Sequence, residues 1–134
     1  MRYLGIDYGK RWVGLAVADT AVDLVLPLET IENKGKEKLF EHLADYIKSE
    51  RIDEVVVGVP FGMGGGATAQ TKEVEAFIAD LAGHIDKPIR EEDERLTSQG
   101  AARLVVNGFG KETRSHSNAA AMILESFVER RKRV

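Results

Sequence analysis

Four ionisable side chains, in three separate parts of the chain, are of the types that bind metal ions or transfer protons. Asp7 lies in the apolar stretch GIDYG, Asp93 and Glu94 follow a short segment after Pro88, and His116 precedes the last predicted helix. Clustered carboxylates repel one another unless a cation neutralises them, and hard oxygen ligands in an open site favour Mg²⁺ or Mn²⁺. Two such metals about 4 Å apart can activate water and stabilise the leaving oxygen of a phosphodiester.

The same four residues also have a structural interpretation. Asp7 could cap a turn, and Asp93 and Glu94 could be solvated side chains. For Asp7 we favour a functional role, because a buried carboxylate without a partner is costly.

A site made from these residues requires a fold that brings distant segments together. Apolar alternation and helical spacing predict the elements, and Gly, Pro, Ser and Thr mark their ends. In chain order we expect strands at 2–8, 12–19 and 22–31, a helix at 36–50, a strand at 54–60, a helix over Val74 to Leu81, a strand from Pro88, a helix from Thr97 or Ser98 to about Val106, and a last helix capped by Ser117 or Asn118.

These elements predict an α/β fold with a mixed sheet. The turn at 9–11 is short enough to join the first two strands as an antiparallel hairpin, and Pro27 indicates that the third strand lies at an edge. Alternation of the later strands with helices is typical of parallel pairing. We therefore expect three antiparallel strands, then two parallel strands, with helices on both faces, in one domain spanning residues 1–134. In such sheets ligands bind at the carboxyl ends of parallel strands.

Residue patterns within two strands predict their surroundings. The second strand places large apolar residues on one face and small residues on the other, where a helix could approach closely: Val13, Leu15 and Val17 against Gly14, Ala16 and Ala18. The strand after Pro88 reads Arg90-Glu91-Glu92, so we expect it to be an exposed edge.

Composition limits the function classes. The chain has 134 residues and no cysteine, which excludes disulfide scaffolds and thiolate zinc sites. No apolar run approaches the ~18 residues that span a bilayer, so we expect a cytoplasmic protein with no membrane partner. The net charge of −3 argues against a purely electrostatic nucleic-acid binder. The basic run 130–133 is interpreted as a solvated helix end that complements the helix dipole.

The glycine-rich stretch FGMGGGATAQ is not a nucleotide-binding loop of the Walker type, because it lacks the GK[ST] ending. GIDYG also looks like the first phosphate loop of actin-like and sugar-kinase ATPases. Those proteins need two such domains to enclose ATP, and 134 residues supply only one. ATP binding is therefore the less favoured hypothesis.

Four motifs occur in a fixed order over nearly the whole chain: GIDYGKRWVGLAVAD, VVVGVPFGMGGG, DERLTS and AAAMILE. On these motifs the sequence resembles the YqgF family of bacterial proteins, which are similar to Holliday-junction resolvases and are assigned as pre-16S rRNA nucleases. GxDxG alone is a weak signal, but its combination with G-x-A-x-x-D, GxP and DERLTS is specific.

The resemblance implies a ribonuclease H-like fold and a metal-dependent nuclease that processes the 5′ end of 16S rRNA in ribosome biogenesis. By motif, Asp7 would be the central Mg²⁺ or Mn²⁺ ligand, and Glu94, together with Asp93, would complete the acidic cluster. Arg95 would contact phosphate or orient the carboxylates, and Thr97 would cap the next helix. The basic residues after GxDxG, here Lys10 and Arg11, would contact nucleic acid.

The main departure from the family pattern is His116, which stands where the family has an aspartate as catalytic residue and metal ligand. A neutral imidazole can bind Mn²⁺ but suits Mg²⁺ poorly, and it could also act as a general base. Two alternatives to a pre-rRNA endonuclease therefore stay open. One is a Holliday-junction resolvase on branched DNA, for which a two-fold homodimer rather than a monomer is expected. The other is an inactive nucleic-acid-binding factor in ribosome assembly.

Overall fold

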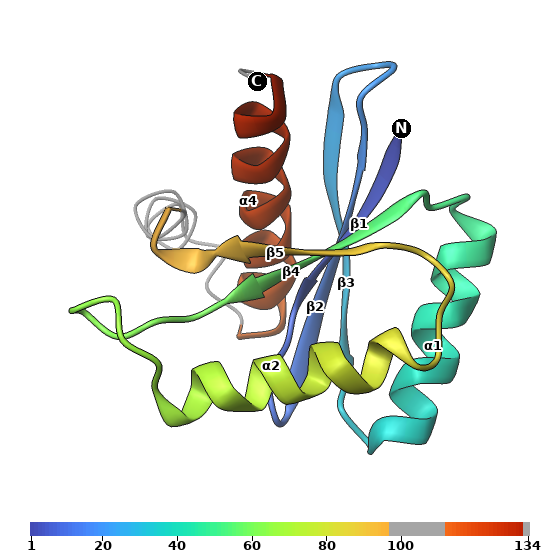
Figure 1. Cartoon of the computed structure of the whole chain (residues 1–134). Helices are drawn as coiled ribbons and strands as arrows, with labels where there is room; N and C mark the ends of the chain where they lie inside the picture. Colours follow the sequence, from blue (N-terminus) through green and yellow to red (C-terminus); the bar gives the residue numbers. More distant parts are fainter. Residues whose placement is uncertain (97–111, 133–134) are drawn as a thin grey trace.

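The computed structural model describes residues 1–96 and 112–132, with side chains in the second range from residue 116 onward. Within these residues, five strands and three α-helices carry the fold, and Figure 1 shows their arrangement. In chain order they are β1 (Arg2–Asp7), β2 (Trp12–Asp19), β3 (Leu24–Glu32), α1 (Lys36–Ser49), β4 (Glu54–Val59), α2 (Ala69–Ala82), β5 (Ile89–Asp93), the single 3₁₀ turn η1 (Glu94–Leu96) and α4 (Glu112–Lys132). Within these ranges no helix is both long and apolar enough to cross a bilayer.

The sheet has the strand order β3-β2-β1-β4-β5. β1 pairs with β2, and β2 with β3, in antiparallel fashion, whereas β4 is parallel to both β1 and β5. The predicted mixed sheet, with its three antiparallel and two parallel strands, is confirmed. Pro27 lies in β3 and the acidic segment Arg90-Glu91-Glu92 lies in β5, so both predicted edge strands are edges. The expected exposure of the second segment is wrong for Glu92, which is fully buried because its side chain faces α4.

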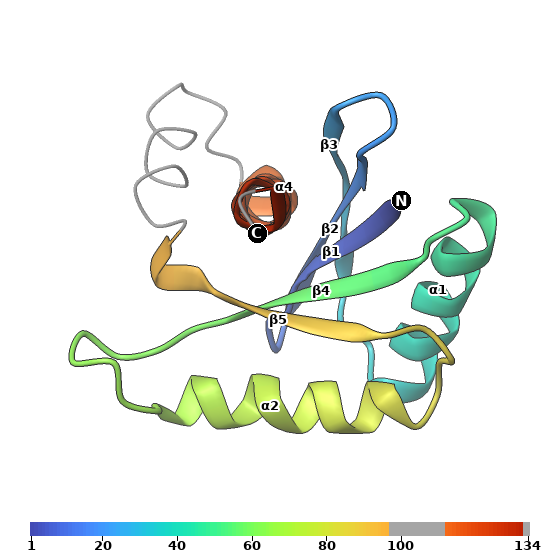
Figure 2. The ribbon, with the colours of Figure 1, turned by 45° about the horizontal axis from the view of Figure 1, so that its top comes forward.

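Helices cover both faces of the sheet, as expected. α1 and α2 lie on one face and α4 crosses the other (Figure 2). The larger residues of β2 point into the core beneath α1 and α2, and its small residues point toward α4: Val13, Leu15 and Val17 on the first face, Ala16 and Ala18 on the second. Strand alternation thus creates two apolar cores of different depth, and burial of apolar surface stabilises each one.

Glycines let α4 lie unusually close to the sheet. A Cβ placed on Gly14 would penetrate the backbone of α4 at the His116 carbonyl and would lie 2.7 Å from the amide nitrogen of Ser117. A Cβ on Gly5 of β1 would lie 2.5 Å from Cγ of Leu124. The small face of β2 therefore fixes the height of the helix above the strands.

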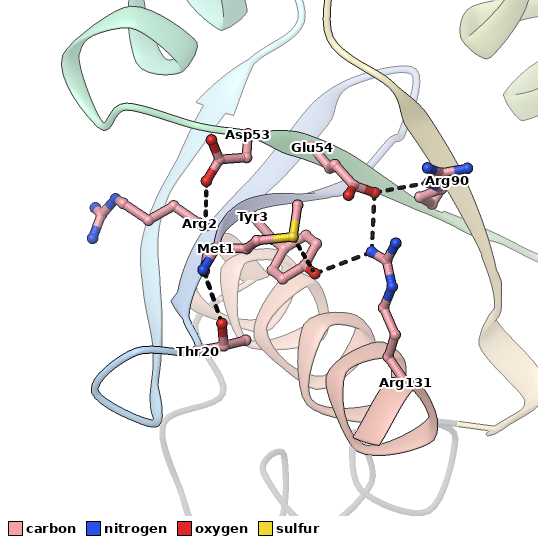
Figure 3. Close-up of polar contacts among 8 residues, drawn as sticks. All are labelled: Met1, Arg2, Tyr3, Thr20, Asp53, Glu54, Arg90 and Arg131. Atoms are coloured by element: carbon pink, nitrogen blue, oxygen red, sulfur yellow. Dashed lines mark hydrogen bonds and ion pairs between the residues drawn. The ribbon is translucent and has the colours of Figure 1, made fainter. Parts of the chain in front are cut away.

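The end of α4 is bound to the sheet through a buried carboxylate (Figure 3). Glu54, at the start of β4, is 5% exposed. It accepts hydrogen bonds from Arg90 Nε at 2.8 Å and from Arg131 Nη1 at 3.0 Å, and Arg131 also donates to the Tyr3 hydroxyl. Burial alone would raise the pKa of Glu54, but the two guanidinium groups outweigh it and lower that pKa.

A second buried carboxylate, Glu92 of β5, is fully buried and accepts a hydrogen bond from Ser126 Oγ at 2.7 Å. Arg130 forms an ion pair with the same carboxylate. Arg130 and Arg131 are exposed, as expected for a solvated helix end, but that interpretation did not include their ion pairs. Each neutralises a buried carboxylate on a strand, an arrangement that sequence proximity does not reveal.

The last helix begins earlier than expected. α4 starts at Glu112, so Ser117 and Asn118 lie inside it and do not cap it; the backbone N–H of Ser117 donates to Thr30 Oγ1 at 3.2 Å. The predicted buried side of this helix is confirmed, with Ile123, Leu124 and Phe127 in the core. The predicted helix from Thr97 or Ser98 to Val106 lies outside the described residues.

Candidate active site

Asp7 is the last residue of β1, at the carboxyl end of the central strand. It lies opposite Gly14 of β2 in the antiparallel register. Since side chains alternate along a strand, and Tyr3 and Ile6 point toward opposite cores, the Asp7 side chain faces α4. Its carboxylate is 18% exposed, which leaves it accessible at one end of the helix.

His116 in the first half of α4 meets this carboxylate. Its Nδ1 lies 3.2 Å from Asp7 Oδ2, and the imidazole is 29% exposed. Because Gly14 has no side chain, the backbone of α4 at His116 can lie close to β2, which brings the imidazole within reach of Asp7. In a neutral imidazole, an Nδ1–H that donates to Asp7 places the lone pair on Nε2. The histidine expected at the family's aspartate position is thus a direct partner of Asp7.

Glu94 reaches Asp7 from the other edge of the sheet. It is the first residue of η1, directly after β5, and its carboxyl group hydrogen-bonds with Asp7. Burial, together with the neighbouring Asp7 and Asp93 carboxylates, raises the pKa of Glu94 to about 8. Such a shift is expected when a carboxyl leaves water and approaches other negative charges. The predicted convergence of Asp7 and Glu94 is therefore present in the structure.

Asp93 and Arg95 form a separate pair beside this cluster. Arg95 donates to Asp93 Oδ2 from Nε at 3.0 Å and from Nη2 at 2.6 Å. The Arg95 guanidinium also lies 5.3 Å from the ring centre of Phe61, in the segment between β4 and α2. Its hydrogen bonds lower the pKa of Asp93. These contacts connect η1, which carries Glu94, to the segment that contains Phe61.

The two basic residues after Asp7 point elsewhere. Lys10 Nζ forms an ion pair with Glu73 of α2 at 3.0 Å, so it is turned toward the face opposite α4. Arg11 is exposed and lies 5.5 Å from the ring centre of Trp12. Both remain candidate contacts for nucleic acid beside the site, and their side chains pair with Glu73 and Trp12 rather than with Asp7.

Sequence reasoning places Gly14 on the small face of β2, where a helix can approach, but it missed Gly58 and Glu92 as residues that shape the site. Gly14 and Gly58 leave space that α4 and Glu94 occupy, and Glu92 binds the far half of the same helix. One signal was present for Gly58: it interrupts the otherwise β-branched run EVVVGVP, and a glycine inside a buried strand marks a close approach by another group.

The donor atoms suit a hard divalent cation, but they are not arranged around one. Among residues 1–96 and 112–132, no group of three or more His, Asp or Glu side chains is placed to hold a metal ion. Instead, Glu94 and His116 each contact Asp7. Burial and neighbouring charge raise the pKa of Glu94, which faces the Asp7 carboxylate. A cation can replace the proton at such a site, so the chemistry of Asp7 and Glu94 suits a divalent cation.

We predict that stability without metal falls as the pH rises from about 5 to 8. Glu94 keeps its proton in the folded state up to about pH 8, whereas the unfolded chain releases it near pH 4.3. Stability is therefore fully present below the unfolded pKa and is lost as pH rises through the folded pKa, by about 2–4 kcal/mol in total. Urea unfolding in EDTA measures this slope.

Glu94→Gln should abolish most of this pH dependence, because it keeps the shape and removes the titration. Glu91→Gln is the matched control, since Glu91 lies on β5, close to Glu94 in sequence, and is exposed. Parallel stability curves for wild type and Glu94→Gln would contradict the prediction.

Known proteins are similar to this chain over nearly its whole length. The family model RuvX, described as Holliday junction resolvase, matches residues 1–130. The chain belongs to this family. The match includes every strand of the sheet and nearly all of α4, and it confirms the resemblance to the YqgF family that the motifs indicated.

Curated RuvX relatives match over almost the whole chain. A protein of Rickettsia africae is 33% identical over 136 residues, covering 98% of this chain and 88% of its own length. A protein of Maridesulfovibrio salexigens is 34% identical over 134 residues, covering 97% of this chain and 99% of its own. Both carry the name "Putative pre-16S rRNA nuclease".

Solved structures show the same fold at low sequence identity. RuvC of Thermus thermophilus in complex with a Holliday junction substrate has a TM-score of 0.61 and 17% identity, with 96% of each chain covered. The Holliday junction resolvase of fowlpox virus has a TM-score of 0.59 and 10% identity, covering 96% of this chain and 99% of its own. The fold is therefore ribonuclease H-like, as in these resolvases.

Proposed function

We propose that residues 1–134 form a single ribonuclease H-like nuclease domain that hydrolyses phosphodiester bonds with Mg²⁺ or Mn²⁺. Its substrate is structured RNA, the 5′ end of the 16S rRNA precursor, during ribosome biogenesis in the cytoplasm. The meeting of Asp7 and Glu94 on the α4 face of the sheet carries the proposal. Membership of the RuvX family and the names of the curated relatives support it.

In this mechanism Asp7 and Glu94 would hold the cation, and His116 would serve beside them as third ligand or general base. A bound divalent cation activates water and stabilises the leaving oxygen of the phosphodiester. Asp7 accepts a hydrogen bond from His116 and orients the imidazole, so that Nε2 can take a proton from an attacking water. The Asp7 and His116 side chains are 18% and 29% exposed, and this partial removal from water strengthens charge interactions between them.

Three basic residues near the site are candidates to contact the phosphate groups of the substrate: Lys10, Arg11 and Arg95. Arg11 is exposed next to the turn that follows Asp7, where a cation can bind a phosphate group. Arg95 is held by Asp93, and this pair positions the Glu94 backbone more than it offers a free charge. Lys10 would have to leave Glu73 to contact nucleic acid, and exposed ion pairs of this kind are weak.

Branched DNA is the second candidate substrate, because the fold matches resolvases from Thermus thermophilus and fowlpox virus. A four-way junction presents two symmetric strands for cleavage, so coordinated resolution requires a two-fold dimer. A monomeric protein in solution would count against junction resolution and leave RNA cleavage intact. Light scattering at the concentration used for cleavage makes this distinction.

The deciding experiment compares three substrates under three conditions. A 16S precursor 5′ fragment, an unrelated structured RNA and a four-way DNA junction are each incubated with Mg²⁺, Mn²⁺ or EDTA. We expect metal-dependent cleavage, fastest on the precursor fragment. Cleavage confined to the junction would support the resolvase, whereas binding of RNA without cleavage under every condition would support an inactive assembly factor.

We predict that His116→Asp shifts the metal preference from Mn²⁺ toward Mg²⁺. A carboxylate oxygen is a hard ligand that Mg²⁺ prefers, and an imidazole is not. The ratio of cleavage rates with Mg²⁺ and Mn²⁺ should rise by about tenfold. His42→Asp on α1 is the control, because His42 lies near Glu29 and far from Asp7 in the fold. An unchanged ratio would remove His116 from the metal site.

A further inference from the structure

Asp7 and Glu94 lie at the ends of two strands that are not adjacent in the sheet. Asp7 ends β1, Glu94 follows β5, and β4 lies between those two strands. Adjacent strands are about 4.8 Å apart, so the two backbones are separated by about 10 Å. The Glu94 side chain must therefore pass over β4 before its carboxyl group can meet that of Asp7.

The residue of β4 at this crossing is Gly58. Ile6 of β1 pairs with Val57 of β4, so the next position places Asp7 beside Gly58. On its other side Gly58 pairs with Glu92 of β5. Asp7, Gly58 and Glu92 thus form one row across the sheet, and all three face α4 by strand alternation.

Glu94 occupies the space that a side chain at Gly58 would need. A Cβ built on Gly58 would lie 2.8 Å from Glu94 Oε1 and 3.0 Å from Glu94 Cγ. Contacts below 3.0 Å essentially do not occur for real Cβ atoms. Any residue other than glycine would force the Glu94 carboxyl group to move away from β4.

We propose that Gly58 is a positioning residue, whose missing side chain opens the path by which Glu94 crosses β4 and meets Asp7. The functional consequence rests on the proposed metal-dependent nuclease, because it assumes that the two carboxylates hold a cation. Mg²⁺ demands near-ideal octahedral geometry at about 2.0–2.1 Å, whereas Ca²⁺ accepts flexible geometry at about 2.3–2.6 Å. Moving Glu94 by a few tenths of an ångström should therefore weaken Mg²⁺ binding more than Ca²⁺ binding.

The obvious variant, Gly58→Ala, has a second contact that must be removed first. The new methyl group would also press on Ile123 Cδ1 of α4. Ile123→Val deletes that terminal methyl and relieves the contact. All variants are therefore made in the Ile123→Val protein. Of the two side chains that a Cβ on Gly58 would meet, Ile123 and Glu94, only Glu94 then remains in close contact.

The first measurement tests the contact without metal. Urea unfolding in EDTA gives the folding equilibrium constant for Ile123→Val, with and without Gly58→Ala, and for the same pair carrying Glu94→Ala. We expect Gly58→Ala to lower the constant by about tenfold when Glu94 is present. The effect should be clearly smaller with Glu94→Ala, because the crowded atoms are gone. Equal effects in both backgrounds would overturn the proposal.

The second measurement tests the consequence for metal. Calorimetric titration with Mg²⁺ and Ca²⁺ compares Ile123→Val with Gly58→Ala/Ile123→Val. We expect at least tenfold weaker Mg²⁺ binding, as for other supports of metal ligands, and a smaller loss for Ca²⁺. Equal Mg²⁺ affinities would overturn the positioning role. If Ile123→Val itself binds no metal, the proposed nuclease site fails, and the unfolding cycle alone then decides whether Gly58 makes room for Glu94.

Discussion

Asp7→Asn is expected to lower metal-dependent cleavage by at least about 10²-fold, with little change in substrate binding. Asparagine keeps the size of the side chain but removes the negative charge that would hold the cation. It also weakens the acceptor for His116, whose Nδ1 lies 3.2 Å from Asp7 Oδ2. Both losses act on the same reaction step, so kcat should fall much more than KM rises.

The folding stability of Asp7→Asn shows whether its loss of cleavage comes from catalysis or from misfolding. The Asp7 charge is one cause of the raised pKa of Glu94, so removing it lets Glu94 ionise more readily in the folded state. Asp7→Asn should therefore unfold at the same or a higher urea concentration. Asp45→Asn on the exposed side of α1 is the matched control and should cleave like wild type. Unchanged metal-dependent cleavage by Asp7→Asn would refute the proposed site.

Gly14→Ala is expected to destabilise the protein by about 2–4 kcal/mol, a large cost for one methyl group. The new Cβ would collide with the backbone of α4 at His116 and lie 2.7 Å from the Ser117 nitrogen. A backbone group cannot rotate away as a side chain does, so the helix must lift from β2. Urea unfolding measures the loss from the midpoint and its slope.

Cleavage should fall along with stability in Gly14→Ala, because lifting this end of α4 separates His116 from Asp7. Gly64→Ala is the control, since a Cβ at Gly64 has no heavy atom within 4 Å. A Gly14→Ala protein as stable as wild type would mean that α4 does not lie on β2 as described.

The same small residues therefore serve the fold and the candidate site. Gly14 sets the height of His116 above β2, and Gly58 leaves room for Glu94 above β4. At the other end of α4, Arg130 and Arg131 bind the buried carboxylates Glu92 and Glu54. Removing Arg130 would leave the buried Glu92 carboxylate without its cationic partner, which is strongly destabilising in proteins, whereas Glu54 would keep Arg90 if Arg131 were removed.

The sequence by itself determined the elements and the mixed sheet, and it singled out Asp7 as a candidate site residue. Period-two alternation in β2 separates its large and small faces, a short turn restricts β1 and β2 to a hairpin, and Pro27 indicates an edge. These signals are local, because they depend on backbone geometry within a few residues. The motif order over the whole chain also identified the family, which a single motif such as GxDxG could not do.

Only the tertiary structure decided which charged residues meet. Asp93 and Glu94 are adjacent in sequence, yet Asp93 pairs with Arg95 while Glu94 turns to Asp7. Arg130 and Arg131 look like a solvated basic end, but each neutralises a buried carboxylate. Such pairings depend on strand order and on the height of α4 above the sheet. Those are distances between segments up to about one hundred residues apart, and no local pattern encodes them.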